Sequence, residues 1–272
     1  MLSPTTISSF QKIVWGYYRK HKRSFPWRET TDPYAILVSE IMLQQTQAER
    51  VVPKFSAFIK RFPTVTSLAR APLSEVLMLW QGLGYNRRAL FLKRAAEEVV
   101  SKHSGKIPNT LESLDALPGI GPYTAGAILA FAFNKPTVFI ETNIRTVFIH
   151  HFFKNARTKV PDGKILPLIE KSLDKKHPRD YYSALMDYGS HLKTTLPNPS
   201  RKSTTHTKQS TFKGSHRELR GRVLKLILTH KKATLTSIKK SLPHQKASSI
   251  TDTIAELASE GLIKKDKRYT LV

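Results

Sequence analysis

Apolar residues recur at helical spacing throughout the first 192 residues of this 272-residue chain. No run of alternating apolar and polar residues interrupts that spacing. Side chains three or four positions apart share one face of a helix, so each such set predicts a helix with one buried face. We therefore expect an all-α domain over residues 1–192. The sets are Phe10, Ile13, Val14 and Tyr17; Ala35, Val38, Ile41 and Met42; Val76, Leu77 and Trp80; and Ala89, Leu92, Ala96 and Val99.

Three proline positions indicate where helices begin. Asp32 precedes Pro33, which is typical of a capping side chain followed by proline at the first helical position. The pairs Ala71-Pro72 and Ile107-Pro108 indicate two further helix starts.

The composition changes near Lys193. Residues 193–216 contain no acidic residue and few apolar ones, which predicts a basic linker. Beyond it we expect helices over 217–229, 235–242 and 246–260, then a short β-hairpin over 262–271. Three helices followed by a small basic hairpin are typical of a winged helix-turn-helix module, here an α+β unit spanning 217–272. Such modules bind duplex DNA, with the third helix in or near the major groove, or pack against proteins.

The charge of the chain is strongly basic. Lys and Arg number 45 against 20 acidic residues, a formal net charge of +25, and residues 193–272 hold 18 of the former and 5 of the latter. Such an excess indicates a polyanionic partner, because each basic group on a phosphate releases counterions. A membrane surface is disfavoured, since the sequence has neither an amphipathic basic helix nor a long apolar span. Charge alone leaves RNA assemblies open, and the linker is compatible with a solvated tether or a strap along a phosphate backbone.

The chain contains no cysteine. This excludes disulfides, thiolate nucleophiles, iron–sulfur clusters and cysteine-based zinc sites. The first ten residues lack the basic and apolar regions of a signal peptide, so the expected location is the cytoplasm, in association with the nucleoid.

A glycine-containing turn lies in the segment 117–126, Leu-Pro-Gly-Ile-Gly-Pro-Tyr-Thr-Ala-Gly. A predicted helix ends before it and an apolar helix follows. Gly119 and Gly121 permit close backbone approach, and the amides at the start of the new helix can bind an anion such as phosphate. Tight packing of two helices is the alternative explanation, because glycine serves that equally well.

This segment resembles the helix-hairpin-helix of base-excision DNA glycosylases, and residues 39–47, Ser-Glu-Ile-Met-Leu-Gln-Gln-Thr-Gln, are similar to the signature of the adenine glycosylase (MutY-type) branch. The resemblance runs from about residue 10 to residue 192. It implies a two-lobed, all-α domain with DNA in the cleft, one lobe spanning 30–135 and the other 1–29 plus 136–192. Further similar segments, in the same order, are 25–28 (Phe-Pro-Trp-Arg), 61–65 (Arg-Phe-Pro-Thr-Val), 79–85 (Leu-Trp-Gln-Gly-Leu-Gly-Tyr) and 186–189 (Met-Asp-Tyr-Gly).

The resemblance assigns two catalytic carboxyl groups. Glu40 would protonate N7 of a flipped adenine, because cleaving the N-glycosidic bond needs a proton on the leaving purine. Apolar neighbours on its helix favour a desolvated carboxyl that keeps its proton, although a capping or ion-pairing glutamate is the simpler interpretation. Glu141 follows Gly121 by twenty positions and would stabilise the cationic sugar. The family usually has aspartate there, so Glu141 is a departure that could alter the activity.

Other residues match the family one by one. Tyr123 corresponds to a pocket tyrosine where bifunctional relatives carry a Schiff-base lysine, so AP-lyase activity is not expected. Asn143 matches an asparagine near the second carboxylate. Taken singly, each of these residues has a simpler explanation, such as capping a helix or packing in the core. The DNA-binding residues implied are Gln44, Gln45, Tyr85, Gly119, Gly121 and Thr124.

Two parts of the family pattern are missing. The usual four cysteines of a [4Fe–4S] cluster are replaced by the linker, so the resemblance is to clusterless members and no cofactor is expected. A structural Na⁺ or K⁺ on the backbone of residues 117–121 is implied by the resemblance alone. We do not expect the family's C-terminal domain that reads 8-oxoguanine, and we expect a winged-helix-like module in its place.

These observations predict a monomeric, monofunctional glycosylase of base excision repair that acts on double-stranded DNA with a mispair or damaged base. It would remove adenine opposite guanine or 8-oxoguanine. One alternative removes thymine or uracil from mispairs with guanine, although Glu40 argues against it because pyrimidines have no N7. Another is a DNA lesion-binding protein that does not cleave, which the Glu141 departure keeps open.

Overall fold

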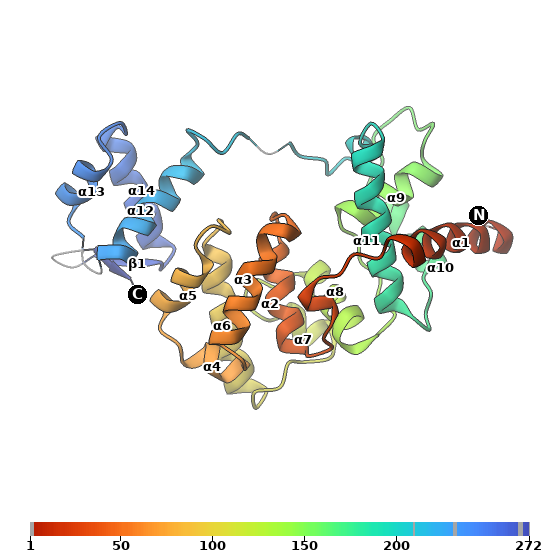
Figure 1. Ribbon diagram of the computed structural model, residues 1–272, viewed down its shortest axis with the longest axis horizontal. Helices are drawn as coiled ribbons and strands as arrows, with labels where there is room; N and C mark the ends of the chain where they lie inside the picture. The colour runs from red at the N-terminus through yellow and green to blue at the C-terminus, as the bar shows by residue number, and fades with distance from the viewer. Residues whose placement is uncertain (1–2, 209, 231–232, 266–268, 272) are drawn as a thin grey trace. The chain divides into compact units, whose positions relative to one another are not determined.

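The computed structural model describes residues 3–208, 210–230, 233–265 and 269–271 (Figure 1). Within them the elements of regular secondary structure are helices, except for one short antiparallel hairpin near the C-terminal end. Several of its helices begin at a side chain that accepts hydrogen bonds from the free amides of the first turn. Asp32, for example, accepts from the backbone N–H groups of Tyr34 and Ala35 at 3.2 Å each, as predicted for a cap before Pro33.

The elements have these bounds: α1 Pro4–His21, η1 Pro26–Arg28, α2 Pro33–Leu43, α3 Ala48–Arg61, α4 Val65–Arg70, α5 Leu73–Trp80, α6 Arg87–Lys102, α7 Leu111–Asp115, α8 Pro122–Phe133, α9 Thr142–Phe152, α10 Asp162–Ser172, α11 Pro178–Thr195, η2 Pro199–Lys202, α12 His216–His230, α13 Leu235–Ser241, α14 Ala247–Ser259, β1 Ile263–Lys265 and β2 Tyr269–Leu271.

The chain forms two compact units. The first contains residues 1–40, 108–116 and 120–208; the second contains residues 41–107, 117–119 and 209–272. The chain passes from one to the other within α2, immediately after Glu40. The lobes predicted over 30–135 and 1–29 plus 136–192 have different boundaries, and that division remains a prediction.

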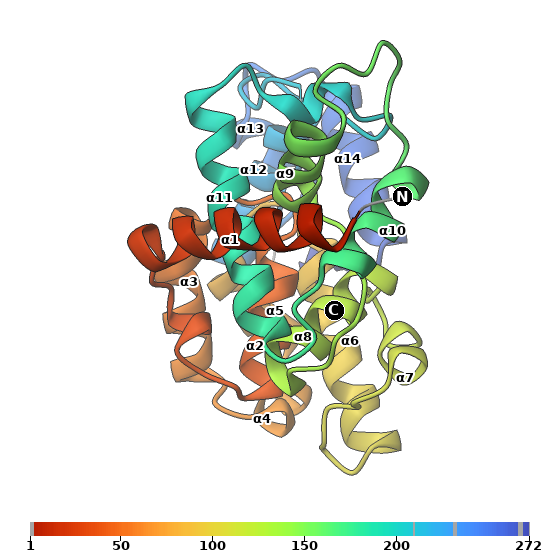
Figure 2. The same cartoon turned by 90° about the vertical axis from the view of Figure 1, so that its right-hand side faces the viewer.

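The first unit packs α1 and α8–α11 around an aromatic core. Helix α1 lies across α10 and α11 (Figure 2). The ring of Tyr182 stacks on Phe139 with centroids 3.9 Å apart, and its hydroxyl donates to the Thr137 carbonyl at 2.7 Å. Stacked, fully buried rings remove a large apolar area from water, which fixes how α11 packs beside the start of α9.

Helix α1 uses a different face from the predicted one. Phe10, Val14 and Tyr18 are buried, whereas Ile13 is 46% exposed and Tyr17 is half-buried. Positions 10, 14 and 18 follow an i, i+4, i+8 line, so the stripe facing α10 and α11 is narrower than the predicted face and excludes position 13.

The second unit contains α3–α6 around a core that includes Phe58 and Trp80, whose rings meet edge to face at 6.1 Å. It also contains α12–α14 and the β1–β2 hairpin, in which Ile263 pairs with Leu271. Ala233, between α12 and α13, exchanges two backbone hydrogen bonds with Tyr269. The predicted hairpin of 262–271 is present in its strands, and its tip, residues 266–268, lies outside the described residues.

Two predicted boundaries are wrong. The helix expected at Ile107-Pro108 begins at Leu111, because Thr110 accepts from the Ser113 amide and so caps α7 three residues later. The first half of the linker predicted over 193–216 is ordered structure: α11 continues to Thr195 and η2 follows. Val160 pairs with Ser203 there, and the Val160 amide donates to the Lys202 carbonyl at 2.8 Å. Polar composition predicted a linker, either a tether or a strap along phosphate, but backbone pairing with Val160 holds residues 202–204 in ordered structure.

No helix in the described part of the chain combines the length and the apolar character needed to cross a membrane.

Candidate active site

Glu40 is a buried carboxyl group of the first unit. It lies in the third turn of α2, and the residue is 6% exposed. The Tyr123 hydroxyl donates a hydrogen bond to it. Burial, together with the nearby Glu141 carboxylate, raises the pKa of Glu40 to about 8, because the low-polarity surroundings disfavour the charged form. At neutral pH Glu40 is therefore a protonated acid, the state that its apolar neighbours on α2 predicted.

Tyr123 lies in the first turn of α8, directly after Pro122. Its ring packs edge to face on Phe139 with centroids 5.8 Å apart. Burial and the charges of Glu40 and Glu141 raise its pKa well above the ordinary tyrosine value, so the phenol keeps its proton and acts as a donor.

Glu141 is the N-cap of α9. Its Oε1 accepts from the backbone amides of Asn143 at 2.7 Å and Ile144 at 2.9 Å, and its Oε2 accepts from Asn143 Nδ2 at 3.3 Å. Burial raises the pKa of Glu141, and the two amide hydrogen bonds oppose that shift by favouring the carboxylate. The side chain is thus held in one orientation by the helix that it caps.

Asn143 Oδ1 is buried and has no hydrogen-bond partner within the protein. A buried amide oxygen without a partner costs about 1–3 kcal/mol, so such groups are rare and often belong to a functional site. Here the oxygen lies on the residue whose backbone and side chain both hold Glu141. Glu40, Tyr123, Glu141 and Asn143, which the family resemblance assigned to catalysis, therefore belong to one cluster in the first unit.

Gly189 allows α11 to approach the start of α9. A Cβ atom added to Gly189 would overlap the backbone carbonyl of Asn143. Only glycine leaves room for that carbonyl, so the close approach of the two helices depends on it. In the sequence Gly189 was recognised only as part of a similar segment.

An ion-pair network adjoins this cluster. Arg28 makes a two-pronged contact with Asp187, at 2.8 Å and 3.0 Å, and Arg23 donates to the same carboxylate at 2.6 Å. Asp187 is only 2% exposed. The Arg28 charge opposes the rise in the pKa of Glu40, as the weakest of the contributions to it. No role was predicted for this network from the sequence, although Arg28 and Asp187 lie in segments that carry the family resemblance.

The predicted DNA-binding residues lie in several places. Gln44 and Gln45 follow α2, and Tyr85 precedes α6 with 38% exposure. These three and Gly119 belong to the second unit, while Gly121 and Thr124 belong to the first. Thr124 is only 3% exposed, which disfavours the predicted contact between its side chain and DNA. Its backbone amide is the group that could still contact a phosphate.

Gly119 is the one residue of the hairpin turn that requires glycine. Its φ is +76°, and a Cβ would lie 2.6 Å from Phe91 Cβ. Gly121 is the N-cap of α8 with φ −104° and open space around it. The two glycines that the sequence presents as equivalent therefore differ: the turn demands the first and tolerates a side chain at the second.

The described residues offer few side chains that could bind a metal ion together. Among the described residues no three His, Asp or Glu side chains come together as metal ligands do, and the chain has no cysteine. The segment that follows α11 does not fit a [4Fe–4S] cluster, because it offers serine and histidine and packs by backbone pairing with Val160.

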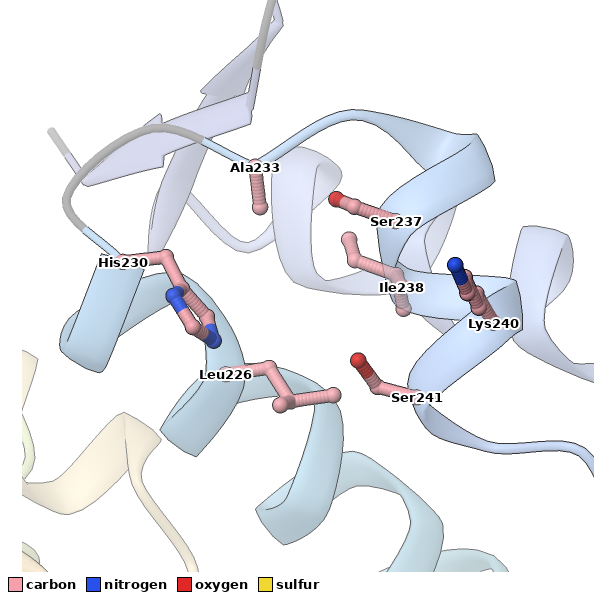
Figure 3. A pocket seen from close by; sticks show the side chains of 7 residues that line it. All are labelled: Leu226, His230, Ala233, Ser237, Ile238, Lys240 and Ser241. Atoms are coloured by element: carbon pink, nitrogen blue, oxygen red, sulfur yellow. The ribbon is translucent and has the colours of Figure 1, made fainter.

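A pocket of about 340 Å³ lies between α12 and α13 (Figure 3). None of the predicted site residues lines it. The pocket is thus separate in composition from the carboxylate cluster. Its lining comprises Leu226, His230, Ala233, Ser237, Ile238, Lys240 and Ser241.

With this geometry established, the class of protein follows. Residues 38–165, which include both glutamates and the hairpin, match the HhH-GPD superfamily of base excision DNA repair proteins, and the chain belongs to that superfamily over this stretch.

Several curated adenine DNA glycosylases are similar to this chain. An adenine DNA glycosylase of Buchnera aphidicola subsp. Baizongia pistaciae is 38% identical over 68% of this chain and 53% of its own length. The adenine DNA glycosylase of Homo sapiens is 34% identical over 67% of this chain and 36% of its own length. The chain thus spans about half the length, or less, of these curated relatives.

Solved structures agree on the fold. A thermostable thymine-DNA glycosylase is 26% identical, with a TM-score of 0.60 over 68% of this chain and 86% of that one. A trapped endonuclease III–DNA covalent intermediate is 17% identical, with a TM-score of 0.61 over 74% of this chain and 99% of that one. The latter likeness concerns the fold alone.

Proposed function

We propose that this protein is a monofunctional DNA glycosylase of base excision repair that removes adenine mispaired with guanine or 8-oxoguanine in double-stranded DNA. The observation that carries the proposal is the buried, protonated Glu40 hydrogen-bonded to Tyr123, in the same cluster as a second carboxylate. The similarity to adenine DNA glycosylases supports the same substrate.

In the proposed reaction, Glu40 donates its proton to N7 of an extruded adenine, and the C1′–N9 bond breaks with its electron pair passing to the base. Glu141 stabilises the positive charge that develops on the sugar. A water oxygen then bonds to C1′ and loses a proton to a carboxylate, which leaves free adenine and an abasic sugar. Two amide donors hold Glu141 in place for this role.

Tyr123 orients the Glu40 carboxyl in this proposal. It occupies the position at which the resemblance places a Schiff-base lysine in bifunctional relatives, and a phenol cannot form a Schiff base. We therefore propose hydrolysis without AP-lyase activity.

Duplex binding would involve the backbone at Gly119 and Gly121, the α8 amides, and the side chains of Gln44, Gln45 and Tyr85. A monovalent cation on the 117–121 carbonyls and a monomeric state are part of the same proposal. Contacts to phosphate make binding sensitive to salt, so affinity should fall steeply with salt concentration, by about one unit of slope per phosphate contact.

The C-terminal module is proposed to be a winged helix. Its order is α12, the Ala233 bridge to Tyr269, α13, α14 and then β1 and β2, which is the order of helices and strands in that class. Lys239 and the exposed Lys240 on α13 favour a nucleic-acid partner over a protein.

The test is single-turnover base release from duplexes that carry A:8-oxoG, A:G, T:G or U:G, with wild type beside Glu40→Gln. Adenine release that falls by about 10²- to 10⁴-fold in the variant supports the proposal. Glu49→Gln, at an exposed position, is the matched control and should not change the rate.

Two other outcomes would replace the proposal. Release of thymine or uracil, unaffected by Glu40→Gln, would assign a pyrimidine specificity and group this chain with the 26% identical thymine-DNA glycosylase. Tight binding without release of any base would indicate a lesion-binding protein in which glutamate at position 141 does not support cleavage of the N-glycosidic bond.

A further inference from the structure

Arg88 is a buried cation in the second unit that the proposed chemistry does not use. It lies in the first turn of α6, and the residue is 9% exposed. Its guanidinium donates to six oxygen atoms. Nη1 reaches the carbonyls of Ile41, Met42 and Gln44 at 2.8, 2.9 and 2.6 Å; Nη2 reaches the carbonyls of Leu83 and Gly84 at 3.2 and 3.1 Å and the Thr46 hydroxyl at 3.1 Å.

These acceptors come from two separate turns. One follows α2 and carries Gln44 and Gln45; the other precedes α6 and carries Gly84 and Tyr85. The Ile41 and Met42 carbonyls belong to the last turn of α2, which has no following helical amides to pair with. One side chain therefore caps α2 and joins the two turns.

Each turn contains a residue in the left-handed region. Gln45 has φ +54° and Tyr85 has φ +47°. For a residue other than glycine this conformation costs about 1–2 kcal/mol and persists only where the surroundings enforce it. Arg88 bonds to the carbonyl immediately before each of them, Gln44 O and Gly84 O. The same guanidinium thus fixes the peptide plane that leads into both strained residues.

The Arg88 charge is retained and is shared among uncharged oxygens. Burial lowers the pKa of Arg88 to about 10, which leaves it charged at neutral pH. Its forked, planar donors can meet carbonyls from both turns at once, whereas a lysine ammonium has three donors at one point. The chemistry of the site therefore calls for arginine and not merely for a cation.

We propose that Arg88 is a positioning residue for base extrusion: it holds the Gln44–Gln45 turn and the Gly84–Tyr85 turn in one mutual arrangement, so that both enter the duplex together as the target base leaves the stack. This inference rests on the proposed function, in which those turns contact DNA. It assigns Arg88 to the extrusion step and leaves proton transfer to Glu40.

The test compares Arg88→Lys with Arg87→Lys. Both keep the charge at neighbouring positions on α6, but Arg87 is exposed and lies against Phe91. Stopped-flow fluorescence of 2-aminopurine placed opposite 8-oxoguanine reports extrusion directly. We expect Arg88→Lys to slow extrusion by about ten- to one-hundredfold, because small misplacements of positioning groups have effects of that size. Duplex affinity should change by less than about threefold, and Arg87→Lys should match wild type.

Amide hydrogen exchange supplies a readout that needs no substrate. Exchange over residues 43–46 and 82–86 should accelerate in Arg88→Lys and not in Arg87→Lys. Thr46→Val removes one acceptor of Arg88 and conserves the shape of the side chain, so it should slow extrusion less than Arg88→Lys does. This variant replaces Arg88→Lys in the test if Arg88→Lys does not fold.

Four outcomes decide the matter. Slow extrusion with loosened turns supports the inference. Loosened turns with normal extrusion, or unchanged exchange, overturn it. Wild-type extrusion without any base release would reject the proposed glycosylase activity and leave the Arg88 inference standing. A wild type that does not extrude 2-aminopurine at all would overturn both.

Discussion

Glu40 in the first unit and Arg88 in the second are both buried ionisable side chains. At neutral pH Glu40 is uncharged, whereas Arg88 carries its charge. Burial and the nearby Glu141 carboxylate keep Glu40 neutral at pH 7, although the hydrogen bond from Tyr123 favours its charged form. Arg88 remains charged at neutral pH, because burial lowers its high pKa only to about 10, and its guanidinium donates to six oxygen atoms. Desolvation penalises the charged form of both groups: it moves the pKa of Glu40 above neutral pH, whereas the pKa of Arg88, although lowered, also stays above neutral pH.

This difference separates a reactive group from an organising one. A neutral acid with a raised pKa can give up its proton when charge develops nearby, at a cost to the stability of the folded state. A charged group such as Arg88 contributes its hydrogen bonds to the stability of the fold. It does not give up its proton near neutral pH. Substitution of the two should therefore change the free energy of unfolding with opposite signs.

The largest expected effect is at Arg88. Arg88→Gln removes most of the donors from five backbone carbonyls and should lower the free energy of unfolding by about 3–5 kcal/mol. Urea unfolding measures it, and the exposed neighbour Arg87→Gln should stay within about 0.5 kcal/mol of wild type. An equally small loss in both variants would show that the hydrogen bonds of Arg88 do not stabilise the fold.

Glu40→Gln should stabilise the protein, and the gain should depend on pH. Between pH 4.5 and about 8 the folded state keeps the Glu40 proton that the unfolded state has released. The unfolded state binds fewer protons there, so the stability of wild type falls as pH rises through this window. The variant should be more stable by about 3 kcal/mol at pH 7 and nearly equal to wild type at pH 4.

Unfolding of wild type and Glu40→Gln at pH 4, 6, 7 and 8 measures this trend, with Glu49→Gln as the control on an exposed face. A gain that does not grow with pH would show that Glu40 is not held in its neutral form.

The same pKa predicts the pH dependence of catalysis. Base release should be constant below pH 7 and fall by about tenfold per unit above pH 8, because the proton donor is lost. Single-turnover rates from pH 6 to 10 measure the profile. A rate that rises with pH through this range would assign Glu40 the role of a base and contradict its proposed part as the acid.

Glu141→Asp tests how closely the site is fitted to glutamate. Aspartate is also a good N-cap, so stability should change by less than about 1 kcal/mol. The carboxylate would move by the length of a methylene, and base release should fall by about tenfold. A rate increase of similar size would instead show that Glu141 weakens an enzyme built for aspartate.

The smallest expected effect distinguishes the hairpin glycines. Gly119→Ala meets both a positive φ and the Phe91 side chain, and should destabilise the fold by about 1–2 kcal/mol. Gly121→Ala has room and an ordinary φ, and should cost about 0.5–1 kcal/mol, the loss expected when alanine replaces glycine at an N-cap. Thermal unfolding of the two variants side by side measures the difference; equal losses would mean that the turn is not the constraint.

Local sequence signals determined a large part of this protein. The all-α character of residues 3–192, the Asp32-Pro33 start of α2, and the hairpin before Pro122 depend on contacts within a few residues, which the sequence displays directly. The two glutamates and Tyr123 were assigned by resemblance. The structure places them in one cluster, while their roles remain proposals.

Tertiary structure alone decided what surrounds those residues. The acceptors of Arg88 are mostly backbone carbonyls up to 47 positions away, and a carbonyl is the same at every residue, so no sequence pattern indicates them. One signal was available: an arginine at position 88 shares the buried face of α6 with Leu92 and Val99. The fit of Gly189 against Asn143 and the pairing of Val160 with Ser203 also depend on distant backbone, which only the folded chain brings together.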